Sequence, residues 1–246
     1  MQAGKPAAGP AGNPAGRPAG ALAVLMAVLT LATGMLEAAS LLALGPVFTA
    51  MQTGNVLFFA FGTVGAGGLS TVAPATSLVA FVVGAVAGAR VEWRLEEQRF
   101  RWFLIALLWE AGMVAVAAVT AWGLEPVRSA PSGRHLATIA VLSAAMGVRN
   151  VTAMRVSVPD MPTTLVTRAM TAFVGGSLLG HDPAFGHTRG ATARRAGSVV
   201  AMFAGGLVGA ACLHHGVPVH ILLLGAAGLA LLTGLAYLPF PHRLSS

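Results

Sequence analysis

The chain has 246 residues, of which 56% are hydrophobic and only 9% are charged. Soluble domains carry roughly a quarter charged residues, so this composition excludes a water-soluble fold. Lysine and arginine outnumber aspartate and glutamate by 15 to 8, but the arginines lie between apolar blocks, which favours membrane orientation over nucleic-acid binding. No stretch alternates with period two, as the strands of a membrane barrel do. The composition therefore predicts an all-α, polytopic transmembrane helical bundle.

The first 20 residues contain four prolines and five glycines, and Met1 has their only large apolar side chain. Such a segment buries too little surface to become ordered, so we expect a disordered arm over residues 1–20. One interpretation of the next stretch is a signal peptide, because Ala38-Ala39-Ser40 resembles a cleavage site. The apolar run continues to Leu44 and further apolar segments follow at once, which favours a membrane span.

Eight apolar segments are long enough, or nearly so, to cross about 30 Å of hydrocarbon at ~1.5 Å per residue. They are Ala21–Leu44, Val47–Gly65, Pro74–Ala89, Trp102–Trp122, His135–Met154, Thr163–Gly180, Gly197–Leu213 and Pro218–Leu238. The second and sixth carry polar breaks near their starts, so each is either a crossing or a re-entrant element. We therefore expect six to eight crossings in one transmembrane domain over residues 21–240, followed by a short tail over 241–246.

The distribution of cations predicts the orientation. With eight crossings and the N-terminus inside, eight cations lie on the inner side: Lys5, Arg17, Arg128, Arg134, Arg189, Arg194, Arg195 and Arg243. Five lie on the outer side: Arg90, Arg94, Arg99, Arg101 and Arg155. This count favours both termini in the cytoplasm. The stretch 90–101 argues against it, and is expected to be either an interfacial helix or a solvated connector.

The two halves of the chain share a pattern. Gly34–Ala38 can be laid on Gly147–Val151, 113 positions later, and Pro46 then falls on Pro159. With one extra residue, Thr53 falls on Thr167. The third and seventh segments share small-residue spacing, at Gly84 and Gly88 and at Gly205 and Gly209. We therefore expect an internal duplication with repeats over 21–125 and 135–240, an arrangement common in secondary transporters.

Four charged residues lie inside apolar segments, where insertion of each costs roughly 2.5–3.5 kcal/mol. They are Glu37, Glu110, Arg149 and Arg168. Two acids and two arginines allow two internal ion pairs. Such pairs would fix helix packing; alternatively, a carboxylate titrates or meets a substrate in a polar cavity.

Two polar interruptions are the most unusual parts of the sequence. In Gly45–Asn55 we expect helix breaks at Pro46 and Gly54, beside the polar side chains of Gln52, Thr53 and Asn55. In Val158–Arg168 we expect breaks at Pro159 and Pro162, beside Thr163, Thr164 and Thr167, with Asn150 in the preceding span. These polar groups, with the four charged ones, are the candidate solute or ion pathway. Alternatively, these hydroxyl groups only form hydrogen bonds to the backbone of their own helix and line no pathway.

Both interruptions resemble the signatures of a known family. Glu37-Ala38 followed by LGPVFTAMQTGNVLF, and later GVRNVTAMRVSVPDMPTTLVTR, resemble the two motifs of the YoaK family of bacterial integral membrane proteins, over residues 21–238. That family usually has aspartate in place of Glu37, methionine in place of Gln52 and glycine in place of Arg168. The resemblance implies a multi-pass protein of the bacterial inner membrane and assigns no substrate.

Other chemistry has no visible residues to carry it. No nucleophile-elbow or nucleotide-binding glycine motif occurs, and the seven histidines do not converge on one point in the expected topology. We therefore expect no enzyme, cofactor or metal. The leading hypothesis is a secondary transporter or permease for a small solute. The alternative is a non-transporting scaffold or lipid-binding partner, in which the Gly-xxx-Gly helices serve packing or association with a second copy.

Overall fold

The computed structural model describes residues 16–97, 101–156, 166–176 and 190–239, and these form helices without any strand. The predicted all-α bundle is therefore confirmed. In chain order the helices are α1 (Gly16–Ala39), α2 (Gln52–Thr63), α3 (Val72–Glu97), α4 (Trp102–Thr120), α5 (Gly133–Val156), α6 (Val166–Gly175), α7 (Ala191–His214) and α8 (Val219–Tyr237). A π-helical segment, η1 (Ser40–Leu44), continues α1, and a short 3-10 turn, η2 (Ala66–Gly68), follows α2.

Six of these helices are long and apolar enough to cross a membrane. They are α1 with η1, α3, α4, α5, α7 and α8. By contrast α2 has 12 residues and α6 has 10, which at ~1.5 Å per residue gives about 18 and 15 Å, too short for a 30 Å hydrocarbon layer. The chain is thus a multi-pass membrane protein in which the described helices α2 and α6 are too short to cross by themselves.

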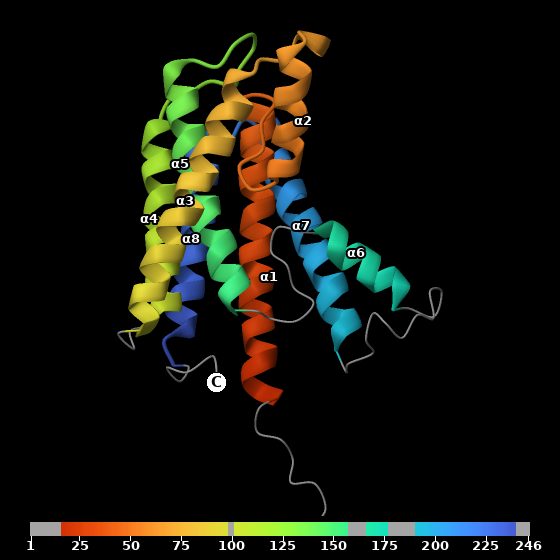
Figure 1. The fold of residues 1–246 in the computed structure, drawn as a ribbon, viewed down its shortest axis with the longest axis vertical. Helices are drawn as coiled ribbons and strands as arrows, with labels where there is room; N and C mark the ends of the chain where they lie inside the picture. Colours follow the sequence, from red (N-terminus) through yellow and green to blue (C-terminus); the bar gives the residue numbers. More distant parts are fainter. Residues whose placement is uncertain (1–15, 98–100, 157–165, 177–189, 240–246) are drawn as a thin grey trace, which may run out of the picture.

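The short helices lie at opposite levels of the bundle (Figure 1). The first helix, α1, rises from the end of the bundle where α8 also ends, and α3 descends again from the other end. Between them α2 occupies only the upper part of the molecule, so the segment from η1 to α3 begins and ends at the same level. Beside the lower half of α7, α6 lies toward the opposite end. The segment that contains α2 is therefore re-entrant in form rather than spanning.

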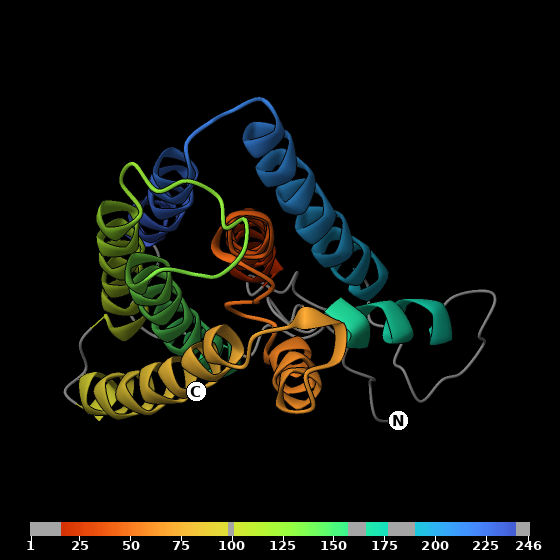
Figure 2. The same cartoon turned by 90° about the horizontal axis from the view of Figure 1, so that it is seen from above.

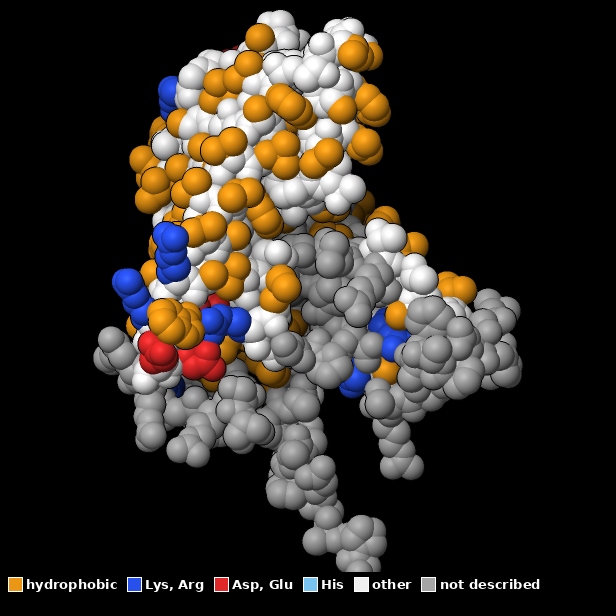
Figure 3. Space-filling model, in the orientation of Figure 1, with side chains coloured by type: hydrophobic (Ala, Val, Ile, Leu, Met, Phe, Trp, Pro, Cys, Tyr) orange, Lys and Arg blue, Asp and Glu red, His pale blue; other side chains and the backbone are white. Residues whose placement is uncertain are grey.

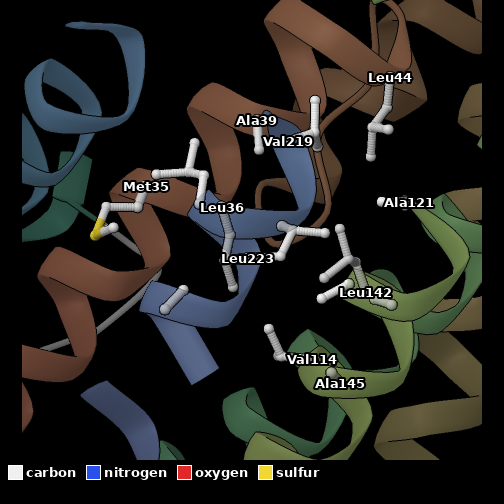
Figure 4. Close-up of a cluster of buried hydrophobic side chains, with 14 of the residues drawn as sticks. Met35, Leu36, Ala39, Leu44, Val114, Ala121, Leu142, Ala145, Val219 and Leu223 are labelled. Carbon is white, nitrogen blue, oxygen red and sulfur yellow. The ribbon is translucent and has the colours of Figure 1, made fainter. Parts of the chain in front are cut away.

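Two helix pairs account for the closest packing, α1 with α7 and α3 with α5 (Figure 2). The four helices α1, α4, α5 and α8 enclose the main apolar cluster, in which Leu36, Val114, Leu142 and Leu223 meet (Figure 4). The outer helices α3 and α7 leave many apolar side chains exposed, as expected for surfaces that face lipid.

Glycines permit both close pairs. A Cβ on Gly84 of α3 would overlap the backbone of Ala144 on α5, and one on Gly205 of α7 would overlap the backbone of Leu31 on α1. Leu31 precedes Ala144 by 113 positions, the same offset that relates Gly34 to Gly147 in the sequence. Missing side chains let backbones approach within the membrane. Gly84 and Gly205 therefore serve helix packing inside one chain.

One turn further along each pair, the same correspondence recurs. A Cβ on Gly88 would lie 3.1 Å from the Cα of Val148, and one on Gly209 would lie 3.1 Å from the Cα of Met35. Met35 and Val148 are again separated by 113 positions. The two pairs therefore match residue by residue, although the side chains at the matched positions differ.

Residues 90–97 are neither a separate interfacial helix nor a solvated connector, because α3 continues to Glu97; residues 98–100 lie outside the described residues. Glu92 is fully buried in this last part of α3 and accepts a hydrogen bond of 2.5 Å from Thr152 on α5. Arg155 forms ion pairs with Glu92 and with Glu96. These partners on α5 keep the charged end of α3 helical and packed.

Candidate functional site

The interruption after α1 is a non-helical stretch from Gly45 to Met51. Gly45 has φ 123° and ψ 175°, a conformation that is open only to glycine, and Pro46 lacks the N–H that a continuing helix would need. Of the two expected breaks, Pro46 lies in the interruption, whereas Gly54 lies within the first turns of α2. A Cβ on Gly54 would lie 2.6 Å from Cδ2 of Phe48, so this glycine makes room for a ring.

Glu37 on α1 holds the interruption in place. Its side chain is buried, and its Oε1 accepts hydrogen bonds from the backbone N–H of Thr49 (3.1 Å), the hydroxyl of Thr49 (3.0 Å) and the backbone N–H of Ala50 (2.5 Å). A carboxylate just before a helix N-terminus is favourable, because it satisfies free N–H groups and meets the positive end of the helix dipole. Its other oxygen, Oε2, is buried and has no hydrogen-bond partner among the described residues.

The polar side chains of α2 bind the same stretch from the other side. Asn55 is buried, accepts a hydrogen bond of 2.9 Å from the backbone N–H of Phe48 and donates one of 2.6 Å to its carbonyl. Gln52 donates a 2.8 Å hydrogen bond to the carbonyl of Thr49. These bonds satisfy backbone groups that have no helical partner, as burial in a membrane protein requires.

Two serines that the sequence analysis did not single out complete this network. Ser77 on α3 donates a 2.7 Å hydrogen bond to the carbonyl of Phe48, and its hydroxyl lies 2.8 Å from that of Ser143 on α5. Both serines are fully buried. A serine inside an apolar helix is a weak signal, because it can satisfy itself on its own backbone, so only the packing of α3 against α5 reveals the role.

Glu110 and Arg149 form a second network, lower in the bundle along α1. The guanidinium of Arg149 makes two hydrogen bonds to the Glu110 carboxylate, one of them 2.7 Å from Nε to Oε2. Its Nη1 also donates to the carbonyl of Leu29 (2.5 Å) and the hydroxyl of Thr33 (2.8 Å) on α1. Glu110 and Arg149 are each 1% exposed. This ion pair, one of the two that the sequence allowed, joins α4 to α5, and the further bonds of Arg149 add α1.

The remaining candidates are not gathered into either network. Thr53 on α2 and Thr167 on α6 are exposed, and Asn150 on α5 is half-buried. Pro159, Pro162, Thr163 and Thr164 lie outside the described residues, as does the side chain of Arg168. Glu37 and Arg149 are therefore in separate networks, connected through α1, where Thr33 lies one turn before Glu37.

The starts of α2 and α6 lie on the same side of α1 (Figures 1 and 2). Each helix begins near the middle of the bundle and runs outward, α2 toward the upper end and α6 toward the lower end of Figure 1. The positive ends of the two helix dipoles therefore point toward the middle of the bundle. Discontinuous helices of this kind occur at the binding sites of transporters.

Comparison with known proteins identifies the family of the chain. A family described as "Protein of unknown function (DUF1275)" matches residues 25–235. The chain belongs to this family. The matched range begins in α1 and ends in α8, and so contains both carboxylate networks. No curated protein and no solved structure matches the chain.

Proposed function

We propose that this membrane protein is a secondary transporter or permease for a small solute, without a cofactor or catalytic step. The observation that carries the proposal is the interrupted helix at 45–51, whose backbone is bound by Glu37 and Asn55 deep in the bundle. Non-helical backbone is stable at membrane depth only where protein buries it or it lines a water-filled cavity. In transporters such stretches surround the substrate and coupling-ion sites.

We infer that the chain is an internal duplication whose halves have opposite orientations in the membrane. The matched contacts of α1 with α7 and of α5 with α3 support this, because Gly205 meets Leu31 as Gly84 meets Ala144. The directions support it as well: α1 and α5 run oppositely, as do α3 and α7 (Figure 1). Inverted repeats allow two alternative arrangements of nearly equal energy, which is the basis of alternating access.

The end of the bundle that carries both termini is cytoplasmic in this proposal. The described arginines outside the core support it, since most lie at that end and few at the other (Figure 3). At the termini end are Arg90, Arg94, Arg101, Arg155, Arg194 and Arg195, and at the other are Arg128 and Arg134. The eight-crossing count puts Arg90, Arg94, Arg101 and Arg155 on the opposite side, because it treats α2 and α6 as crossings. With six crossings, the stretch 90–101 satisfies the positive-inside rule.

The resemblance to the YoaK family remains part of the proposal, because the family match names no such protein. It would place the chain in a bacterial inner membrane. The motifs that carry the resemblance lie on α1, the interruption and α2, and on α5 and the start of α6. These are the elements that the transport hypothesis uses.

Flux measurements test the proposed function. We would reconstitute the full chain into vesicles and follow uptake of radiolabelled sulfate, phosphate, amino acids, monosaccharides and monovalent cations under an imposed proton gradient. We expect saturable, gradient-dependent uptake for at least one class, reduced in Asn55→Ala and unchanged in Thr53→Ala, whose side chain is exposed. Folded protein without flux for any class would contradict transport and favour the scaffold alternative.

A further inference from the structure

The two buried glutamates of the central bundle differ in what balances their charge. Glu110 faces Arg149, and both of its oxygens accept hydrogen bonds. Glu37 forms no ion pair within the described part of the chain, and one of its oxygens is without a partner. An arginine beside a carboxylate compensates its negative charge. A buried carboxylate without a cation can exchange a proton instead.

The surroundings of Glu37 act on its two protonation states in opposite directions. Three hydrogen bonds to Oε1 and the N-terminal end of α2 stabilise the charged form. Burial inside the membrane, with 5% of the residue exposed, favours the neutral form. The unpartnered Oε2 is the atom that can take up the proton. The carboxylate then becomes a neutral carboxyl group, and one negative charge disappears from the start of α2.

Other titratable groups do not interfere with this balance. Those on the elements packed around α1 and η1 at this level are Glu125, His135, Arg149, Cys212, His214 and His220. His135 is bonded to Ser132 and to the carbonyl of Glu125, and His220 stacks on Trp122. In the described part of the chain none of the six has a hydrogen bond or ion pair to Glu37. The interruption and α2 contribute no titratable side chain.

We propose that Glu37 is a proton-binding site and that its protonation loosens residues 45–51 from α1. A neutral carboxyl oxygen accepts hydrogen bonds less strongly than a charged one, so the three bonds to Thr49 and Ala50 weaken together. Gly45 is the first residue of this stretch, and its backbone freedom allows the stretch to move relative to α1. The role in coupling rests on the proposed transport function, whereas proton binding itself does not. In transport, this step links the proton gradient to the interrupted helix.

Infrared difference spectroscopy of the full chain in lipid vesicles tests the proton site directly. A protonated side-chain carboxyl gives a carbonyl band that disappears when the pH rises. We expect such a band in the wild type, its loss in Glu37→Gln, and its retention with a shifted midpoint in Glu37→Asp. Matched controls are Glu92→Gln, which removes another buried acid, and Glu110→Gln with Arg149→Met, which removes the paired one; the band persists in both.

Three outcomes would overturn the proposal: a band that titrates unchanged in Glu37→Gln, a band lost in Glu92→Gln instead, or no titrating band in the wild type. If Glu37→Gln does not fold, Glu37→Asp decides, because an unaltered midpoint there contradicts the assignment. Absence of solute flux with an intact Glu37 band would remove transport and leave the proton site standing. The two proposals therefore fail separately.

Cysteine labelling tests the movement. In a Cys212→Ala background, Met51→Cys reports on the interruption, and Ala66→Cys in the exposed turn η2 corrects for the pH dependence of thiol reactivity. We expect the ratio of the two labelling rates to rise several-fold as the pH falls, and to be independent of pH when Glu37→Gln is added. A ratio that is constant with pH in the Glu37 background, or that still changes in Glu37→Gln, would overturn the coupling of protonation to release.

Discussion

The Glu110 and Glu37 sites look alike in the sequence and differ in the structure. Each is an acid inside an apolar helix, flagged by the same insertion cost. Glu110 is balanced by a cation on another helix, Arg149, while Glu37 is balanced by backbone and hydroxyl donors of a broken helix. The comparison teaches that a buried charge acquires its role from its partner. An ion pair holds helices together, and an unpaired carboxylate is free to titrate.

The largest effect is expected at the paired site. Glu110→Gln leaves Arg149 charged and buried, which should destabilise the fold by about 3–5 kcal/mol. Adding Arg149→Met should recover much of this loss, because no uncompensated charge remains. Thermal unfolding and the yield of monodisperse protein after detergent extraction measure both variants. A Glu110→Gln protein as stable as the wild type would show that the pair does not stabilise the fold.

A smaller loss is expected where side chains bind the interruption. Asn55→Ala removes both hydrogen bonds to Phe48. The N–H of Phe48 is then unsatisfied, at a cost of about 1–3 kcal/mol, whereas its carbonyl still accepts from Ser77. The matched control is Thr53→Ala, since Thr53 is exposed on the same helix. Unfolding midpoints of the two variants compare them. Equal midpoints would show that Asn55 does not hold residues 45–51.

The helix pairs around both sites should respond to added volume. Gly84→Ala and Gly205→Ala place a methyl group against the backbones of Ala144 and Leu31, which should cost about 1–3 kcal/mol. Gly112→Ala in α4 has open space around it and should be neutral or stabilising, because alanine favours helix more than glycine does. Folded yields rank the three variants. A loss at Gly112→Ala as large as at Gly84→Ala would remove the packing explanation.

The smallest effect on stability is expected at Glu37, which sharpens the contrast with Glu110. Glu37→Gln keeps an oxygen that can accept from Thr49 and Ala50 and leaves no cation unpaired, so the loss should be about 1 kcal/mol. The same unfolding measurement serves for both glutamates. A loss as large as that of Glu110→Gln would mean that the charge of Glu37 is structural, and would erase the distinction between the sites.

Much of the scaffold follows from the sequence alone. The six long apolar segments are the six candidate spans. Inside a membrane, a single segment can pair its backbone N–H and C=O groups only by forming a helix. The offset of 113 positions between Gly34 and Gly147 anticipated the matched contacts at Leu31 and Ala144. Pro46 predicted the break for a reason of covalent chemistry. These features depend on local composition, which the sequence contains in full.

Only the tertiary structure decided which elements cross and which charges meet. The segments at α2 and α6 were close to the length limit, so their apolar content could not exclude a crossing. The partner of Glu110, the capping role of Glu37 and the contribution of Ser77 all depend on residues distant in the chain. Their energies come from burial and geometry between helices, and a one-dimensional pattern does not contain these quantities.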